Sequence, residues 1–567
     1  MGELRGSLRS AGDRAVWLGP ALLTLVVGLY RIGTPELWRD EVSTWSASTR
    51  GVGELFAMLG HVDASHGAYY LPLHFWTAVF GDSPTALRLP SALAMAGACA
   101  FAALTARRMF GSRVAGLSAG LLFATVPNVS RYAQEARSYA IVTCAVAAGL
   151  CLLLRALERP SVGRWAGYGA VTAVAAALHL VSLIGLVGQL PFVLLSRGPR
   201  RGRWQFPFAA LAAVALVLPL VAVGRSQSTR QLAWLHRPTA YELRFFWQEL
   251  FGSYQVLYVF LALAGVALLW PGRRVAAVRL LVLAGLPVVV VWLLSQGGTS
   301  YFVDRYLLFT LPGWAALAGG GVAALAAGVR RLLGGSVTSR KRADLPAADL
   351  PTAAERTVAA GAGPAAGGTA DGVAGGPGGE AGGGAVGEGG GRGREGDGPG
   401  AGAGVGVAAT ALVTAGVLAV PVVLGFPAEE AVRSVAAHTT TDFRGAARTV
   451  AAGYRAGDAL VALGGDYAWA MTGPALSYYL PDSIRPAQPF VERSAVQAGD
   501  LYPVESRAPA STIGDEPRVW VVTIGTGEDP YRNLPAAQAE ALRSVFTPTE
   551  VRHVRGLTVT LLVRSRR

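Results

Sequence analysis

The feature that most constrains this chain is a series of apolar runs, each about as long as a membrane-spanning helix. A span needs about 20 mainly apolar residues, and the chain has eleven candidates. They lie near residues 15–34, 86–106, 112–129, 139–155, 164–178, 180–196, 205–223, 253–270, 277–295, 306–328 and 404–425. Only 15% of the 567 residues are charged, against about 25% in a soluble domain. We therefore predict a polytopic all-α membrane protein of about eleven transmembrane helices.

Clusters of basic residues test this arrangement, because they fall in alternate loops between the predicted spans. With a cytoplasmic N-terminus every dense cluster lies on the inner side, as the positive-inside rule requires. The clusters are Arg107, Arg108 and Arg113; Arg155, Arg159 and Arg164; Arg197, Arg200, Arg201 and Arg203; Arg273, Arg274 and Arg279; and Arg330, Arg331, Arg340, Lys341 and Arg342. These loops account for the formal net charge of +14 without a nucleic-acid partner. The predicted location is the cytoplasmic membrane.

Composition divides the chain into four parts. Residues 1–342 form a transmembrane core, and 404–425 form the last helix. Residues 343–403 are rich in Gly, Ala and Pro and cannot bury enough apolar surface to fold, so a disordered cytoplasmic linker is predicted. Residues 426–567 have mixed composition and are predicted to form a small extracytoplasmic α/β domain. Its helices are expected at 442–457 and 535–546, and its strands at 458–464, 518–525 and 556–565.

Two glycine turns follow predicted strands of that domain, "GGDYAW" (464–469) and "GTGEDP" (525–530). A role in ligand binding is possible for such turns. Ordinary turns are far commoner than ligand loops, however, and glycine is the usual residue in them. We therefore interpret both segments as plain turns.

The first outer loop contains the stretch "LWRDEVSTWS" (37–46), with Asp40 and Glu41 between Trp38 and Trp45. One interpretation is a hydrated loop with aromatic anchors, since tryptophan gathers at membrane interfaces. The other is a catalytic carboxylate held at the lipid–water interface.

The next stretch of that loop, "HVDASHGAYYLPLHFW" (61–76), holds three histidines and one acid. His61, His66 and His74 with Asp63 match no strong zinc spacing. A polar, partly buried loop helix is therefore favoured over a metal site, and no metal ligands are predicted.

Three arginines on the predicted outer side are candidates for binding a lipid phosphate. Arg131 and Arg137 lie in "RYAQEARSYA", which is expected to open a helix, and Arg305 lies in "SYFVDRY". A guanidinium forms two-point, charge-assisted hydrogen bonds to phosphate oxygens. The alternative is that each arginine is neutralised by a neighbouring acid, Glu135 or Asp304.

The order of several motifs resembles a known family. The "DE" pair, "AYYLPLHFW", "FGDSPTALRLPSALA", "RRMFG" and "YAQEARSYA" follow one another, and "FVDRYLLFTLPGWAALAG" comes near the end of the core. This order is similar to that of the dolichyl-phosphate-mannose-protein mannosyltransferase-like group of GT-C membrane glycosyltransferases, especially bacterial members that use polyprenyl-phosphate sugars. The resemblance covers roughly residues 15–330. The family's His-Pro-Pro run is replaced here by "DASHGAYYLP".

This resemblance implies an inverting transfer of a mannose-like sugar from a polyprenyl-phosphate donor to a hydroxyl on a glycan, lipid or protein acceptor. Asp40 would be the general base, and Glu41 would position the acceptor or orient Asp40. Arg131, Arg137 and Arg305 would hold the donor phosphate. Contacts to the acceptor or the sugar would come from Trp38, His66, Tyr69 and His74. The resemblance implies no certain cofactor, although a divalent cation remains possible.

Two other classes of function compete with this prediction. A transporter or flippase of lipid-linked sugars would need ionisable residues within spans or an internal repeat. The predicted spans carry few charges, and no clear repeat relates the two halves. A non-catalytic sensor or scaffold, with ligand binding by the outer domain, is the third possibility.

Overall fold

The computed structural model describes residues 2–231, 235–343 and 401–565. They form two compact units, Met1–Ala326 with Val413–Arg567, and Ala327–Leu412. The features discussed below belong to the first unit, except for residues 327–343 and 401–412 of two long helices, which belong to the second. The predicted linker, 343–403, lies outside the described residues except for its first residue and its last three.

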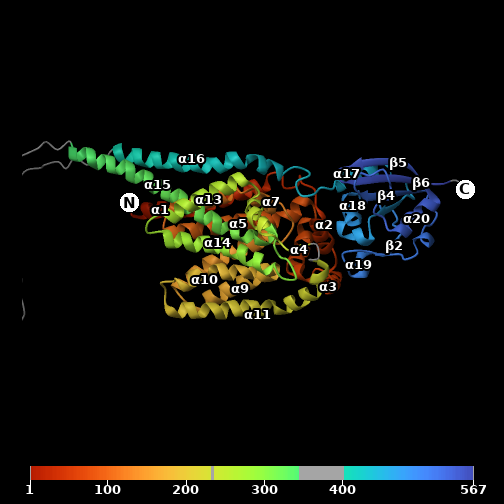
Figure 1. The fold of residues 1–567 in the computed structure, drawn as a ribbon, viewed down its shortest axis with the longest axis horizontal. Helices are drawn as coiled ribbons and strands as arrows, with labels where there is room; N and C mark the ends of the chain where they lie inside the picture. The colour runs from red at the N-terminus through yellow and green to blue at the C-terminus, as the bar shows by residue number, and fades with distance from the viewer. Residues whose placement is uncertain (1, 232–234, 344–400, 566–567) are drawn as a thin grey trace, which may run out of the picture. The chain divides into compact units, whose positions relative to one another are not determined.

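Long apolar helices make up most of the first unit (Figure 1). Their bounds are α1 Gly2–Leu29, α5 Pro84–Phe110, α6 Arg113–Phe123, α8 Tyr139–Glu158, α9 Val162–Leu178, α10 Gly185–Leu194, α11 Arg200–Gln231, α13 Tyr254–Leu269, α14 Arg274–Leu294, α15 Leu311–Ala343 and α16 Ala401–Ala431. Helix α5 packs between α1 and α8, α8 packs on α9, and α10 packs on α14.

Shorter helices lie between these long ones. They are α2 Arg39–Ser48, α3 Val52–His61, η1 Ala64–His66, α4 Gly67–Phe80, α7 Pro127–Ala133, η2 Leu180–Ile184, α12 Ala240–Phe251 and η3 Asp304–Thr310. The first four occupy the segment predicted as a long outer loop. Helix α12 lies within the segment 224–252, which was also predicted to be a loop.

Each of the eleven predicted spans overlaps a helix of the structure. Among the described residues, seven helices are long and apolar enough to cross a membrane, or eight if α12 and α13, bent by 96°, count as one. Helix α6 has 11 residues, about 16 Å of helix against about 30 Å of hydrocarbon. The multi-pass architecture is confirmed, whereas the number eleven stays a prediction.

One helix prediction needs correction at its end. The span predicted at 112–129 breaks after Phe123, because Pro127 begins α7 and the preceding Val126 is extended (φ −82°, ψ 116°). A residue before proline is pushed out of the helical region. The segment "RYAQEARSYA" opens a helix as predicted, since α8 begins at Tyr139. The predicted turn at His179 is confirmed between α9 and η2.

Three consecutive glycines bring α15 close to its neighbours. A Cβ atom on Gly319 would lie 2.4 Å from the Ala115 carbonyl oxygen, and one on Gly321 would lie 2.0 Å from the Leu263 carbonyl oxygen. A Cβ on Gly320 would lie 2.2 Å from the Phe110 ring. Small residues allow backbones to approach closely inside a membrane, where packing drives helix association. Glycine at these positions therefore lets α15 lie at the centre of the bundle. In the segment Asp304–Leu333, which includes most of α15, 94% of the apolar 18-residue stretch is buried.

The C-terminal domain is built on a four-stranded sheet with the order β1-β4-β6-β5. Strand β1 (Ala459–Ala462) is parallel to β4 (Arg518–Ile524), whereas β6 (Leu557–Arg564) is antiparallel to β4 and to β5 (Phe546–Val554). Helices α17 Phe443–Gly453, α18 Thr472–Tyr479 and α20 Ala536–Val545 pack around the sheet, and a small ribbon joins β2 Val491–Arg493 to β3 Val504–Glu505. The helices η4 Gly465–Ala470, α19 Ala495–Ala498 and η5 Pro509–Ser511 complete the domain. The predicted α/β domain is confirmed.

Strand β5 was not predicted from the sequence. Most of its residues are exposed, so it lacks the apolar alternation that marks a half-buried strand. It also contains Pro548, where the register with β6 shifts. Proline and irregular register are typical of edge strands, and β5 is at the sheet edge.

Candidate functional site

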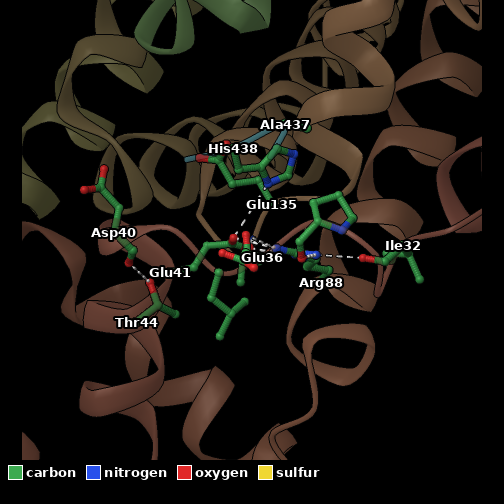
Figure 2. A network of polar contacts seen from close by, with 12 residues as sticks. Ile32, Glu36, Asp40, Glu41, Thr44, Arg88, Glu135, Ala437 and His438 are labelled. Carbon is green, nitrogen blue, oxygen red and sulfur yellow. Dashed lines mark hydrogen bonds and ion pairs between the residues drawn. The ribbon is translucent and has the colours of Figure 1, made fainter. Parts of the chain in front are cut away.

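Helix α2 separates the two adjacent acids of the first outer segment. It begins at Arg39, after an extended Trp38 (φ −87°, ψ 170°), and Asp40 and Glu41 lie in its first turn. Acids are favoured there because helix N-termini carry partial positive charge. Successive side chains on a helix point about 100° apart. Figure 2 shows the two carboxylates extending in different directions from α2.

Glu41 points inward and forms a two-point ion pair with Arg88 of α5. The Arg88 Nε donates to Oε1 at 2.8 Å, and Nη2 donates to Oε2 at 2.7 Å. Both side chains are 0% exposed. Burial alone would raise the pKa of Glu41, but the contact with Arg88 holds it below its ordinary value. The interaction keeps both groups charged inside the protein.

This ion pair also fixes the chain on both sides of the site. Arg88 Nη1 donates to the carbonyls of Ile32 and Pro35, which precede α2. Glu41 Oε1 accepts a 2.8 Å hydrogen bond from the backbone N–H of Ala136. Glu41 therefore holds the start of α2 and the loop of Arg137 in place. This buried position leaves Glu41 no exposed surface for an acceptor, whereas the other role predicted for it, orienting Asp40, is compatible with its place in the same helical turn.

Two further buried groups surround the pair, and we call Glu41, Arg88, Glu135 and His438 together the Glu41 cluster (Figure 2). His438 comes from the segment after α16, and its Nδ1 lies 3.7 Å from Glu41 Oε2. Burial lowers the pKa of His438 to about 4. Burial raises the pKa of the Glu135 carboxyl to about 7, and Arg131 opposes this effect.

Asp40 points away from this cluster, and its side chain is 22% exposed. Its carboxylate forms an ion pair with Arg39, whose Nε lies 3.4 Å from Oδ1. The Asp40 carbonyl accepts a 3.4 Å hydrogen bond from Arg137 Nη1, and the guanidinium of Arg305 lies over Trp38, which directly precedes α2. We call these residues, with Trp38 and His66, the Asp40 site.

The guanidinium of Arg137 is buried and contacts neutral groups. It donates to the Tyr70 hydroxyl at 3.1 Å and to the Thr44 hydroxyl at 3.3 Å. Its Nη2 lies 2.6 Å from His66 Nε2. Burial and the adjacent guanidinium hold the pKa of His66 well below its usual value, so the neutral ring accepts this hydrogen bond. These contacts orient the cation without neutralising it.

Aromatic rings surround Arg305, the second cation of the site. Its guanidinium lies over Trp38, 5.7 Å from the ring centroid, and 5.6 Å from that of Tyr306. Tyr306 in turn packs against His179 and Tyr139. Stacking on rings holds the planar guanidinium in place. The Asp40 site thus combines one acid with two positioned cations.

Comparisons with known proteins find a family model that is similar to part of this chain. Residues 68–224 match the family model described as dolichyl-phosphate-mannose-protein mannosyltransferase. The predicted resemblance to this group is confirmed. No match was found among curated proteins.

Solved structures show the fold. ArnT from Cupriavidus metallidurans in the apo state has a TM-score of 0.56 and 14% identity, covering 98% of this chain and 98% of that chain. The same protein bound to undecaprenyl phosphate has a TM-score of 0.52 and 14% identity, covering 96% of this chain and 98% of that chain. The GT-C-like fold of this chain is therefore shown over nearly its full length.

The remaining predicted site residues have partners other than Asp40 or are buried. Arg131 is partly neutralised, since its Nη2 is 3.7 Å from Glu135 Oε2 and its Nη1 donates to the Ala437 carbonyl at 3.1 Å. His74 contacts the carbonyl of Ser48, at the other end of α2. Tyr69 is 3% exposed. Of these three residues, Arg131 lies in the last turn of α7, just before the segment between α7 and α8 that holds Arg137.

Sequence reasoning missed several residues of the arrangement. Arg88 lies in the motif "FGDSPTALRLPSALA" but was not predicted as a site residue, although a lone charge inside an apolar run signals a buried partner. Tyr139 and Tyr306 follow closely after Arg137 and Arg305, but nothing in one sequence brings the two segments together. His438 lies in the predicted outer domain and has no local signal.

The residues present do not fit a dedicated divalent-cation site. No group of three or more His, Cys, Asp or Glu side chains converges within the described ranges. His61 contacts the Gly499 carbonyl, whereas His66 and His74 have separate partners. The charge opposite Asp40 is supplied by arginines instead.

Proposed function

We propose that this protein is an inverting glycosyltransferase that moves a sugar from a polyprenyl-phosphate donor to a hydroxyl acceptor. The Asp40 site carries the proposal, because a partly exposed acid lies near two oriented cations that are not in its own helix. The confirmed family resemblance supports it. So does the fold shared with ArnT, whose structure bound to undecaprenyl phosphate is similar.

The residues have distinct roles in this reaction. The acceptor oxygen attacks the anomeric carbon while the bond from that carbon to the phosphate oxygen breaks. Asp40 accepts the hydroxyl proton, a contribution of typically 10²–10⁴-fold. Arg137 and Arg305 stabilise the charge of the departing polyprenyl phosphate. One direct displacement inverts the anomeric configuration.

A mannose-like donor is the most specific form of the proposal, because the matched family model is described by mannose transfer. Purified full-length protein in liposomes should transfer sugar from a polyprenyl-phosphate hexose or pentose to a hydroxyl acceptor, with inversion detected by NMR of the product. The transporter alternative would be favoured if the protein moved the donor across the bilayer but transferred no sugar from a mannosyl, glucosyl or arabinosyl donor. No feature of the structure specifically favours that alternative.

We further propose that the reaction takes place on the outer face of the cytoplasmic membrane. The one-sided basic clusters support this orientation. A cysteine replacing exposed Ser511 should react with an impermeant reagent in intact cells, whereas one replacing exposed Val162 should not. The reverse pattern would contradict this orientation.

A further inference from the structure

The C-terminal domain contains a cavity that the Asp40 site does not use. Its volume is about 390 Å³, within the range of about 300–1,000 Å³ typical of small-molecule sites. It lies beside strand β1 and the glycine turn that follows it, and the segment from Ala498 to Glu505 forms another wall. Clefts beyond the carboxyl ends of parallel strands are common ligand sites, and β1 and β4 are parallel.

Polar atoms without partners line this cavity. The Thr472 hydroxyl and the Gln538 Oε1 atom are buried and have no hydrogen-bond partner among the described residues. Thr472 is 1% exposed and Gln538 is 3% exposed. A buried polar atom that lacks a partner destabilises the folded protein. Two such atoms on the walls of one cavity therefore indicate a ligand with matching polar groups.

The cavity wall also contains the carboxylate of Glu505, which is held in one position by its neighbours. Gln538 Nε2 donates to Glu505 Oε2 at 2.9 Å, which turns the free Oε1 of Gln538 away from that contact. A Cβ atom on Gly464 would lie 1.5 Å from Glu505 Oε1, so only glycine permits the carboxylate to lie there. The turn "GGDYAW", which looked ordinary in the sequence, thus seats Glu505 at the cavity.

The charges of the lining exclude an anionic ligand. Glu505 and Asp500 are acidic, and the described lining contains no Lys, Arg or His. Carboxylate and amide oxygens accept hydrogen bonds, and a threonine hydroxyl both donates and accepts. The partly exposed Tyr502 and several aliphatic residues supply apolar surface. Hydroxyl groups around an apolar ring, as in an uncharged saccharide, match this pattern.

The segment that forms one cavity wall is attached to the membrane part of the chain. Arg50 donates to the Asp500 carbonyl at 2.8 Å, and His61 Nδ1 lies 3.0 Å from the Gly499 carbonyl. On the same side, Trp469 lies over the guanidinium of Arg39, beside Asp40. A saccharide held in the cavity would therefore be anchored on the side of the domain that meets α2 and α3.

We propose that this cavity binds a saccharide of one or two rings and serves as a docking site for a glycan acceptor. The acceptor role rests on the proposed transferase activity, whereas saccharide binding does not depend on it. The site is separate from the donor-phosphate cations Arg137 and Arg305.

Binding can be tested with the full-length protein in nanodiscs by saturation-transfer NMR. The probes are the methyl glycosides of mannose, glucose, arabinose and glucosamine. Gln538→Ala removes the orphan acceptor, and Gly473→Leu fills the cavity, where an added Cβ would meet nothing closer than Ala462 at 3.7 Å. Each variant should weaken binding of the best probe by at least ~10-fold. The matched controls are Glu540→Gln and Ala537→Leu, both at exposed positions of α20.

The outcomes separate this inference from the proposed function. Asp40→Asn should slow transfer by at least ~10²-fold and leave glycoside binding unchanged, whereas Gln538→Ala should raise the KM for a glycan acceptor and leave donor binding unchanged. Normal transfer by a protein that binds no glycoside would overturn the cavity inference alone. Equal binding by the wild type and both cavity variants would also overturn it. If the protein bound a glycoside and both cavity variants weakened that binding, but no sugar transfer occurred, the proposed transferase activity would be overturned instead.

Discussion

The Glu41 cluster and the Asp40 site begin at neighbouring residues and differ in how their charges are satisfied. Glu41 and Arg88 neutralise each other at 0% exposure, and backbone groups use their remaining hydrogen-bonding capacity. In the Asp40 site the acid is partly exposed, and Arg137 is oriented by neutral partners. Two adjacent acids can thus be placed one in a buried ion pair and one at a partly exposed position, because a helix turns them toward different environments.

The largest effect is expected from breaking the Glu41 cluster. Glu41→Gln leaves the buried Arg88 without a counter-charge, which typically costs ~3–5 kcal/mol of unfolding free energy. Unfolding in detergent, followed by tryptophan fluorescence, would measure this loss. Glu430→Gln is the control, because Glu430 forms an ion pair with Arg31 at 3.8 Å and is 48% exposed. Equal stability of the two variants would show that the Glu41 cluster is not structural.

The next effect concerns the cations of the Asp40 site. Arg137→Lys removes the planar fork, so affinity for polyprenyl phosphate should fall ~10-fold or more. Arg131→Lys should have a smaller effect, because Arg131 already contacts Glu135 and the Ala437 carbonyl. Binding to lipid nanodiscs containing polyprenyl phosphate measures both, with exposed Arg448→Lys as a control. Unchanged affinity in the Arg137 variant would remove this residue from the donor site.

A third effect should appear as a pH dependence of stability near the Glu41 cluster. Burial and the neighbouring Asp442 carboxylate raise the pKa of Glu36 from 4.5 to about 8, against the opposing Arg444 and Arg555. Between these two values the folded protein binds more protons than the unfolded chain, so stability should fall as pH rises. Glu36→Gln should flatten the dependence of Tm on pH over this window. If the wild-type Tm rose between pH 5 and 8 and the Glu36→Gln variant gave the same profile, the raised pKa of Glu36 would be contradicted.

The smallest effect is expected from the Gly-rich segment. Removing half of residues 343–403 should leave insertion and turnover nearly unchanged, because the entropy of loop closure varies slowly with length. Turnover of the shortened protein in liposomes measures this. A large loss of turnover with normal insertion would reveal a specific partner for the segment.

The apolar helices were predictable because each is a long run of one composition. Where a run is interrupted by a local signal, as at Pro127 or His179, the chain also breaks there, although only the second break was foreseen. The order of motifs was enough for the family, since it depends on several short stretches together. Edge strand β5 was not predictable, because exposure removes its pattern.

The candidate site was predictable in its residue types and not in its partners. Asp40, Arg137 and Arg305 stood out as polar residues on one predicted side of the membrane. Their proximity depends on the packing of distant segments, which a single sequence does not encode in any local pattern. The burial of Glu41 follows from Arg88 in α5 and from His438 in the C-terminal segment. Neither contact is visible until the fold is known.

The central claim is that Asp40 is the base and Glu41 is not, and single-turnover transfer by Asp40→Asn tests it most directly. Asparagine keeps the size of the side chain but cannot take up a proton at neutral pH. The variant should fold and bind donor normally, and its transfer rate should fall by at least ~10²-fold, the lower end of general-base contributions. Near-normal transfer by a well-folded Asp40→Asn protein would contradict the account.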